Sequence, residues 1–238
     1  MIGIIGGNGV AATNKLLSLI EESITRSGAY RDGHHPEMVV FYATQAPSRS
    51  MYLEGRGPSW IENYVEVGKK LKDCGCDELC MCCNTAHYAI DELCEKIGIP
   101  FINLLDLVAK RCLEEGVKKV GMMCTDGLRK VGLYEKYFTA VAPGIELVYP
   151  NDEIQELVTK GICGAKEKIR FTDPDKEEMH PYNCFAKVCN HLRNDLGVDC
   201  IVAGCTDICN VYDGDQFPYV DSLSVLADYI VNHHTIQY

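Results

Sequence analysis

The chain has 238 residues, of which 47% are hydrophobic and 24% are charged, and its formal net charge is -11 at pH 7. This length and balance are typical of a folded globular protein with one large α/β domain or two small lobes. The negative charge argues against a nucleic-acid-binding surface, and the apolar runs are too short to span a bilayer. The first residues lack the basic segment and cleavage pattern of a signal peptide, so we expect a strand there.

The fourteen cysteines indicate which redox compartment the protein occupies. Most of them lie in apolar segments such as residues 79–83, and the chain is larger than a typical disulfide-rich domain. We therefore expect a cytoplasmic protein whose cysteines are mostly buried free thiols. Their spacing is not the paired Cys-x-x-Cys that zinc prefers, so we predict no metal site in the densest group, which is Cys74, Cys76, Cys80 and Cys82.

Apolar runs alternate with segments of helical period, which predicts βαβ units and a parallel sheet. Strands are expected at residues 2–5, 38–43 and 78–82, with a helix near 60–71. A glycine turn after the first strand leads to a helix whose apolar face is Ala12, Leu16, Leu19, Ile20 and Ile24. After the third strand, Asn84 and Thr85 are suitable N-cap residues for a helix that Gly98 and Pro100 end.

Three segments of the first half resemble three segments of the second half, in the same order and at nearly the same offset. The pairs are residues 3–9 with 121–127, 77–84 with 199–206, and 100–103 with 218–221. Three matches in register indicate a duplicated βα unit. We therefore predict an α/β fold with two similar lobes of parallel-sheet βα units, related by a pseudo-two-fold axis, with the active site between them. Residues 1–103 plus 215–238 are assigned to lobe 1 and residues 104–214 to lobe 2.

The duplication places Cys83 and Cys205 at equivalent positions, each where a predicted strand ends. Open α/β sheets bind ligands at the carboxyl ends of their strands, so we expect the two thiols on opposite sides of one cleft. Two such groups can move a proton between the faces of an α-carbon, because one accepts while the other donates. A helix start lowers the pKa of a nearby thiol, as expected for Cys83. Candidate donors for a substrate carboxylate are Asn84, Thr85, Thr125 and Thr206.

The segments Cys83-Asn84-Thr85-Ala86-His87 and Gly204-Cys205-Thr206 resemble the two signature motifs of the aspartate/glutamate racemase superfamily. Residues 6–13 are similar to the family's glycine-rich first turn, and residues 47–50 resemble a motif of its aspartate racemase branch. The similarity extends from the first strand to residue 221. It implies a two-lobed α/β fold, amino-acid racemisation without pyridoxal phosphate, metal or other cofactor, and commonly a homodimer.

The resemblance also implies roles for individual residues. Cys83 and Cys205 would be the acid/base pair, with Cys83 facing the D-enantiomer and Cys205 the L-enantiomer. Arg49 and Lys166 would bind the side-chain carboxylate of a small acidic amino acid, and Lys168 is a rival to Lys166. The remaining substrate-binding residues would be Asn8 in the first turn and, around the α-carboxylate, Asn84, Thr85, Thr125 and Thr206.

Departures from the family pattern leave the substrate open. Ser48 stands where the family has Asp, and Asp207 stands where glutamate racemases usually have His. The substrate could therefore be aspartate, glutamate or a broad range of amino acids. Hydantoin racemases, maleate isomerases and related decarboxylases share the two-lobed fold. Arg49 weighs against the substrates of those last three classes.

Two further hypotheses come from other functional classes. Gly7-x-Gly9-x-x-Ala12 fits the loose fingerprint of a dinucleotide-binding oxidoreductase, but residues 42–45 supply no carboxylate for the ribose. A thiol sensor or metal-binding protein is suggested by the cysteine count alone.

Overall fold

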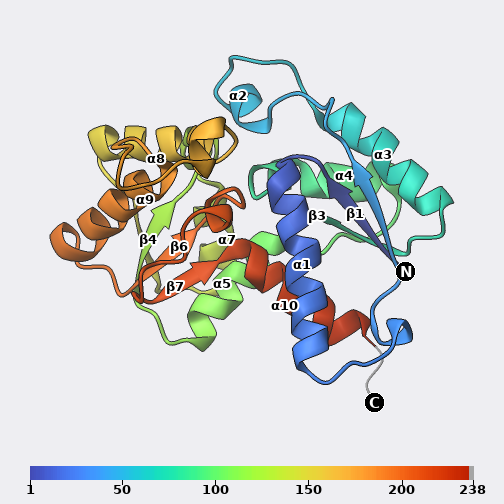
Figure 1. Ribbon diagram of the computed structural model, residues 1–238. Helices are drawn as coiled ribbons and strands as arrows, with labels where there is room; N and C mark the ends of the chain where they lie inside the picture. The colour runs from blue at the N-terminus through green and yellow to red at the C-terminus, as the bar shows by residue number, and fades with distance from the viewer. Residues whose placement is uncertain (236–238) are drawn as a thin grey trace.

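The computed structural model describes residues 1–235 and contains two parallel β-sheets (Figure 1). The first sheet has the strand order β2-β1-β3 and consists of β1 (Ile2–Gly6), β2 (Met38–Tyr42) and β3 (Glu78–Met81). The second has the order β5-β4-β6-β7 and consists of β4 (Lys119–Met123), β5 (Glu146–Val148), β6 (Cys200–Ala203) and β7 (Tyr219–Asp221). The predicted α/β class, the two lobes and the parallel sheets are confirmed.

Helices surround both sheets. Those before the second sheet are α1 (Val10–Arg26), α2 (Arg49–Leu53), α3 (Ile61–Asp73), α4 (Ile90–Ile97) and α5 (Leu104–Glu114). Those that follow its first strand are α6 (Asp126–Lys130), α7 (Leu133–Val141), α8 (Asp152–Gly164), α9 (Pro181–Asn190) and α10 (Ser222–His234). Within residues 1–235 no helix is both long and apolar enough to cross a membrane.

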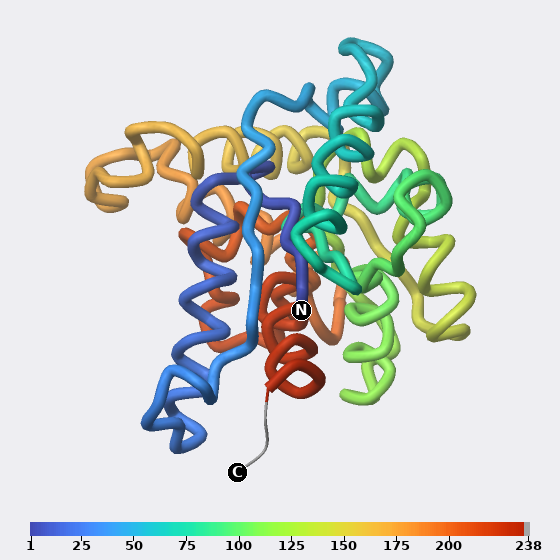
Figure 2. The backbone as a smooth tube through the Cα atoms, turned by 90° about the vertical axis from the view of Figure 1, so that its right-hand side faces the viewer, coloured from blue at the N-terminus to red at the C-terminus, as the bar shows by residue number. Residues whose placement is uncertain are grey.

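Three hydrophobic clusters form the core. One lies between the outer face of the first sheet and helices α3 and α4, and another between the second sheet and helices α8 and α9. The largest joins the inner faces of both sheets to α1, α5, α7 and α10. Both views of the chain show α1 and α10 side by side at the centre of this shared layer (Figures 1 and 2). A single core therefore fixes the two lobes relative to each other.

The duplication predicted from the sequence is present in the strand pairing. β1 pairs with β3 as β4 pairs with β6, in parallel and in the same order. An isolated bridge from Leu79 to Phe101 corresponds to the pairing of β6 with β7. The next residues also match, because the side chains of Asn103 and Asp221 cap the first turns of α5 and α10.

The lobe boundary differs from the sequence assignment at one strand. β7 lies within residues 215–238, which we assigned to lobe 1, but it pairs with β6 in the second sheet. α10 then leaves that sheet and packs against α1 and α5. The chain therefore returns to lobe 1 at α10 and not at residue 215, because β7 completes the hydrogen bonding of β6 while the apolar face of α10 fits the shared core.

The segment after β3 begins as a 3-10 helix (Thr85–Ala89) and becomes α4 only at Ile90. His87 determines this local geometry, because its ring Nδ1 bonds the carbonyl of Cys83 at 2.9 Å and its Nε2 accepts from the N–H of Leu104 at 3.1 Å. Acceptance at Nε2 requires the neutral imidazole, and burial lowers the pKa of His87 to about 4. One ring thus connects the loop after β3 to the start of α5.

We expect His87 to make folding stability pH-dependent. Its pKa is about 6.5 when unfolded and about 4 when folded, so its contribution is complete above pH 6.5 and is lost as the pH falls through 4. A shift of this size corresponds to roughly 3 kcal/mol. In urea unfolding measured from pH 7.5 to 4.5, His87→Gln should be less stable at pH 7.5, and the difference from the wild type should shrink towards pH 4.5. A difference that stays constant across this range would contradict the assignment.

Candidate active site

The pocket between the carboxyl ends of the two sheets collects the residues singled out by sequence. Its volume is about 60 Å³, and its lining includes all nine predicted site residues: Asn8, Arg49, Cys83, Asn84, Thr85, Thr125, Lys166, Cys205 and Thr206. Ser48, Ser50, Ile162 and Asp207 complete the lining. A larger outer cavity of about 550 Å³ shares five of these residues, which are Asn8, Ser48, Arg49, Lys166 and Asp207.

Cys83 and Cys205 occupy equivalent places, each two residues beyond the end of a strand, β3 in one lobe and β6 in the other. Both side chains are partly accessible free thiols. Gly204 allows this arrangement, because a Cβ there would lie 2.8 Å from the Tyr134 ring. The duplicated strand ends thus bring both thiols to one pocket.

The sequence supported no expectation for the pKa of the second thiol, Cys205, and the structure shows that this pKa is raised. Burial, and next the charge of Asp207, raise the pKa of Cys205 to about 12, against the opposing effect of Lys166. Cys205 is therefore a protonated thiol at neutral pH in the substrate-free protein.

Arg49 is brought to the pocket by the short helix α2, which Ser48 caps by accepting from the N–H of Met51. Its guanidinium donates to the backbone carbonyls of Asn8 at 2.9 Å and Pro47 at 3.1 Å. Burial opposes the charge of Arg49, but interactions with Cys83, Tyr64 and Asp207 together outweigh that effect and raise the pKa of the guanidinium. Arg49 therefore remains a cation next to one of the two thiols.

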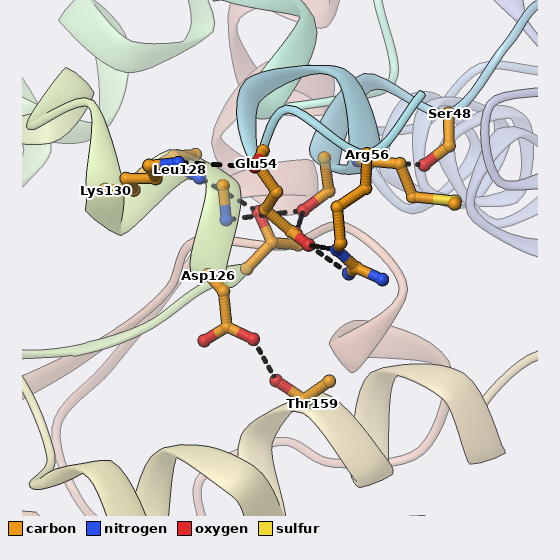
Figure 3. A network of polar contacts seen from close by, with 11 residues as sticks. Ser48, Glu54, Arg56, Asp126, Leu128, Lys130 and Thr159 are labelled. Carbon is orange, nitrogen blue, oxygen red and sulfur yellow. Dashed lines mark hydrogen bonds and ion pairs between the residues drawn. The ribbon is translucent and has the colours of Figure 1, made fainter. Parts of the chain in front are cut away.

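Contacts between α2 and α6 fix this segment against the other lobe (Figure 3). The Ser50 hydroxyl donates to Glu54 at 2.6 Å and accepts from the N–H of Gly127 at 3.3 Å, and Lys130 donates to the Glu54 carbonyl at 3.3 Å. A Cβ at residue 127 would lie 2.8 Å from the Ser50 carbonyl oxygen, so a glycine is needed for this approach. The position of Arg49 thus depends on both lobes.

Asn8 and Asn84 line the pocket, and the side-chain NH2 groups of both donate hydrogen bonds within the protein. The Asn8 amide donates to the Tyr64 hydroxyl, while its backbone carbonyl accepts from Arg49. The Asn84 amide donates to Ser222 at 2.9 Å and accepts from the Tyr134 hydroxyl at 2.8 Å. Both residues therefore position neighbouring groups, a role that the sequence did not indicate.

The three threonines connect the lobes. Thr206 donates to the carbonyl of Cys82 at 2.8 Å, and the hydroxyls of Thr85 and Thr125 are hydrogen-bonded at 3.2 Å. Thr125 also caps α6 by accepting from the N–H of Leu128. These bonds cross from one sheet end to the other beside the thiols.

Lys166 lies in the pocket and Lys168, its rival in the sequence, is absent from the lining. The Lys166 ammonium forms an ion pair of 2.9 Å with Asp207, which is buried. Burial opposes the charge of Lys166, but Asp207 and then Cys205 outweigh it and raise the pKa of the ammonium.

Sequence reasoning assigned no site role to four polar residues of this region: Tyr64, Tyr134, Asp207 and Ser222. Asp207 had a signal, since it directly follows the second cysteine motif. The other three lie on helices whose periodicity indicates only packing, so their contacts with Asn8 and Asn84 depend on tertiary structure.

Comparison with known proteins identifies the family. The model of the Asp/Glu/hydantoin racemase family matches residues 2–230. The chain belongs to this family. It is therefore a racemase, an isomerase.

Individual relatives agree with this assignment. The chain is 24% identical over 233 residues to the broad specificity amino-acid racemase RacX of Bacillus subtilis, with 95% of each chain covered. The solved structure of Picrophilus torridus aspartate racemase is 25% identical with a TM-score of 0.80, covering 97% of this chain and 92% of that one. A Francisella tularensis glutamate racemase structure in complex with D-glutamate, 16% identical, shares the fold, with a TM-score of 0.58 and coverage of 97% and 79%.

The four cysteines considered as zinc ligands do not all lie on the same side of the first sheet. Cys80 and Cys82 pack in the shared inner core, whereas Cys76 packs in the outer cluster and Cys74 is exposed. Among residues 1–235, no three His, Cys, Asp or Glu side chains come together as a metal-binding group. The four cysteines cannot coordinate a single ion in this arrangement.

The raised pKa of Cys205 has a direct consequence for thiol alkylation. Iodoacetamide reacts with the thiolate, so with a pKa of about 12 the rate at Cys205 should rise about tenfold per pH unit from 7 to 9. Peptide mass spectrometry of partially alkylated protein measures this rate, and a model-peptide cysteine, with a pKa of about 8.5, is the reference. A rate at Cys205 that reaches a plateau below pH 9 would contradict the raised pKa.

Proposed function

We propose that this racemase interconverts the L- and D-forms of aspartate or glutamate by two-base proton transfer between Cys83 and Cys205, without a cofactor. The observation that carries the proposal is the convergence of two thiols, at equivalent strand ends, with two cations from opposite lobes in one pocket. One thiol on each side of an α-carbon removes a proton from one face and returns a proton to the other. Arg49 supplies positive charge for the substrate's side-chain carboxylate, while Lys166, in the same pocket, is paired with Asp207.

The α-carboxylate needs hydrogen-bond donors, because negative charge develops beside it when the α-proton is removed. The side chains of Asn84 and Thr206 already have partners in the protein. The backbone N–H groups of Asn84, Thr85 and Thr206 donate to no backbone carbonyl within residues 1–235. We therefore assign α-carboxylate binding to these N–H groups, with the hydroxyls of Thr85 and Thr125 beside them.

The protonation state of Cys205 before substrate binds suits this proton exchange between the two thiols. Cys205 is a thiol at neutral pH because burial and then Asp207 raise its pKa to about 12, so it starts as the proton donor. Cys83, the proposed proton acceptor, lies next to the Arg49 cation. Proton transfer exchanges the two roles, and the reverse reaction restores them.

A racemase of broad amino-acid specificity is the second candidate. It is favoured by the likeness to a broad specificity amino-acid racemase along 95% of the chain. In that case the chemistry at the two thiols is the same and only the side-chain subsite differs. A chiral assay over a panel of acidic and neutral amino acids, run without added cofactor, separates the two candidates.

Single-cysteine variants test the two-base mechanism. Cys83→Ser and Cys205→Ser should each lose racemisation, because a hydroxyl is a far weaker base than a thiolate at neutral pH. In D2O, Cys83→Ser should exchange the α-proton of the L-enantiomer more readily, and Cys205→Ser that of the D-enantiomer. NMR measures the exchange and chiral chromatography the racemisation.

The matched control for these variants is Cys74→Ser, an exposed thiol outside the pocket, which should retain wild-type rates. Substantial racemisation by the double variant Cys83→Ala/Cys205→Ala would overturn the mechanism. Activity lost on dialysis and restored by pyridoxal phosphate would do the same.

Arg49 variants test recognition of the side-chain carboxylate. Arg49→Ala should lower kcat/KM for the acidic substrate by about 100-fold, or roughly 3 kcal/mol, since it removes a charge-assisted contact. Arg49→Lys should restore only part of the loss, because lysine cannot reproduce the planar fork. Arg56→Ala changes an exposed arginine of the same segment and should have little effect. Unchanged kinetics in Arg49→Ala would remove Arg49 from the site.

A further inference from the structure

A buried carboxylate occupies the side-chain end of the pocket. Asp207 is 3% exposed, and its Oδ2 lies 2.9 Å from the Lys166 ammonium and 3.9 Å from the Cys205 sulfur. The cation that the substrate carboxylate would use is therefore already paired within the protein. An ion pair in this position changes what the pocket can bind.

A glycine of the opposite lobe leaves space for this carboxylate. Asp207 Oδ1 lies against Gly9, where any Cβ would collide with it. Gly9 is the N-cap residue of α1, and the first turn of α1 has neither a side-chain cap nor an acidic residue. The positive end of the α1 dipole thus lies near the Asp207 carboxylate. Lys166 from one lobe and the start of α1 from the other both lie beside the carboxylate.

The charged side chains that line the pocket set the net charge of the side-chain subsite. The lining of the inner pocket contains two cations, Arg49 and Lys166, and one carboxylate, Asp207, and a third cation, Arg170, lines only the larger outer cavity. Lys166 pairs with Asp207, whereas Arg49 bonds two backbone carbonyls, interacts with Cys83 and forms no ion pair with a carboxylate of residues 1–235. The side-chain subsite therefore has one net positive charge, and Arg49 carries it.

We propose that Asp207 is a specificity-determining residue, which limits the side-chain subsite to a single positive charge. The inference rests on the proposed racemase function and deepens it by defining the substrate class. One positive charge is balanced by one side-chain carboxylate, so aspartate or glutamate binds. The Arg49 guanidinium also bonds backbone carbonyls, so the subsite can bind a neutral polar side chain, such as that of asparagine, without a carboxylate to balance the charge. Two unpaired cations would discriminate more strongly in favour of the acid.

The test compares aspartate with asparagine, which are nearly isosteric and differ by one charge. Asp207→Asn frees Lys166, so the ratio of kcat/KM for aspartate to kcat/KM for asparagine should rise at least tenfold. The double variant Asp207→Asn/Lys166→Met restores one net positive charge and should return the ratio to within about threefold of the wild type. Effects on thiol reactivity act on both substrates and cancel in the ratio. Glu146→Gln, an exposed charge change in the same lobe, is the matched control and should leave the ratio unchanged.

Binding is measured separately from turnover. Protection of Cys83 and Cys205 from iodoacetamide by succinate and by succinamate reports the same charge preference without racemisation. A preference for succinate that rises at least tenfold in Asp207→Asn supports the inference even if no amino acid is racemised, an outcome that would contradict the proposed function alone. Asp207→Ser, which also removes the charge, replaces Asp207→Asn if that variant does not fold.

Two results would overturn the inference while the racemase function stands. In the first, the wild type racemises aspartate, and the ratio of kcat/KM for aspartate to kcat/KM for asparagine in Asp207→Asn is within twofold of the wild-type ratio. The other is an equal loss for both amino acids with unchanged protection by succinate, which indicates that Asp207 binds the α-ammonium group, because succinate lacks that group.

Discussion

Buried hydrogen bonds between the carboxyl ends of the two sheets are the constraint on which the active site depends. Thr206 donates to the carbonyl of Cys82, Tyr134 donates to Asn84, and Thr85 bonds Thr125, and each bond joins one lobe to the other. Such bonds are geometrically demanding, because an unpaired polar group in a buried site costs about 1–3 kcal/mol. The thiols are adjacent in sequence to these residues, so the bonds that connect the lobes also fix the two sulfur atoms.

Two charged side chains reach the same pocket from distant parts of the chain. Arg49 comes from α2, which the contacts of Ser50 with Gly127 place against the second lobe. Lys166 comes from the end of α8 and is fixed by its ion pair with Asp207. The pocket therefore acquires its charge only when the lobes come together. Desolvation of Cys205 in this pocket raises its pKa, so the protonation state of this thiol depends on the surrounding geometry.

Much of this arrangement could be predicted from the sequence. Internal similarity identified the duplicated units, and the structure confirms it in the pairing of β1 with β3 and of β4 with β6. The apolar periods located the first three strands to within one or two residues, because alternation and helical spacing are local properties. The nine predicted site residues all line one pocket, since parallel strands carry their carboxyl ends to a common edge.

The sequence by itself thus determined the fold class, the two equivalent thiols and the residues that surround them, because strand ends and turn motifs are encoded within short segments. Tertiary structure decided which partner each polar group has. Only packing pairs Asn84 with Tyr134 and Ser222, or turns α10 back to the first lobe after β7 has joined the second sheet. It also decided the pKa of Cys205, since desolvation depends on the atoms that surround a group in space and not on its neighbours in the chain.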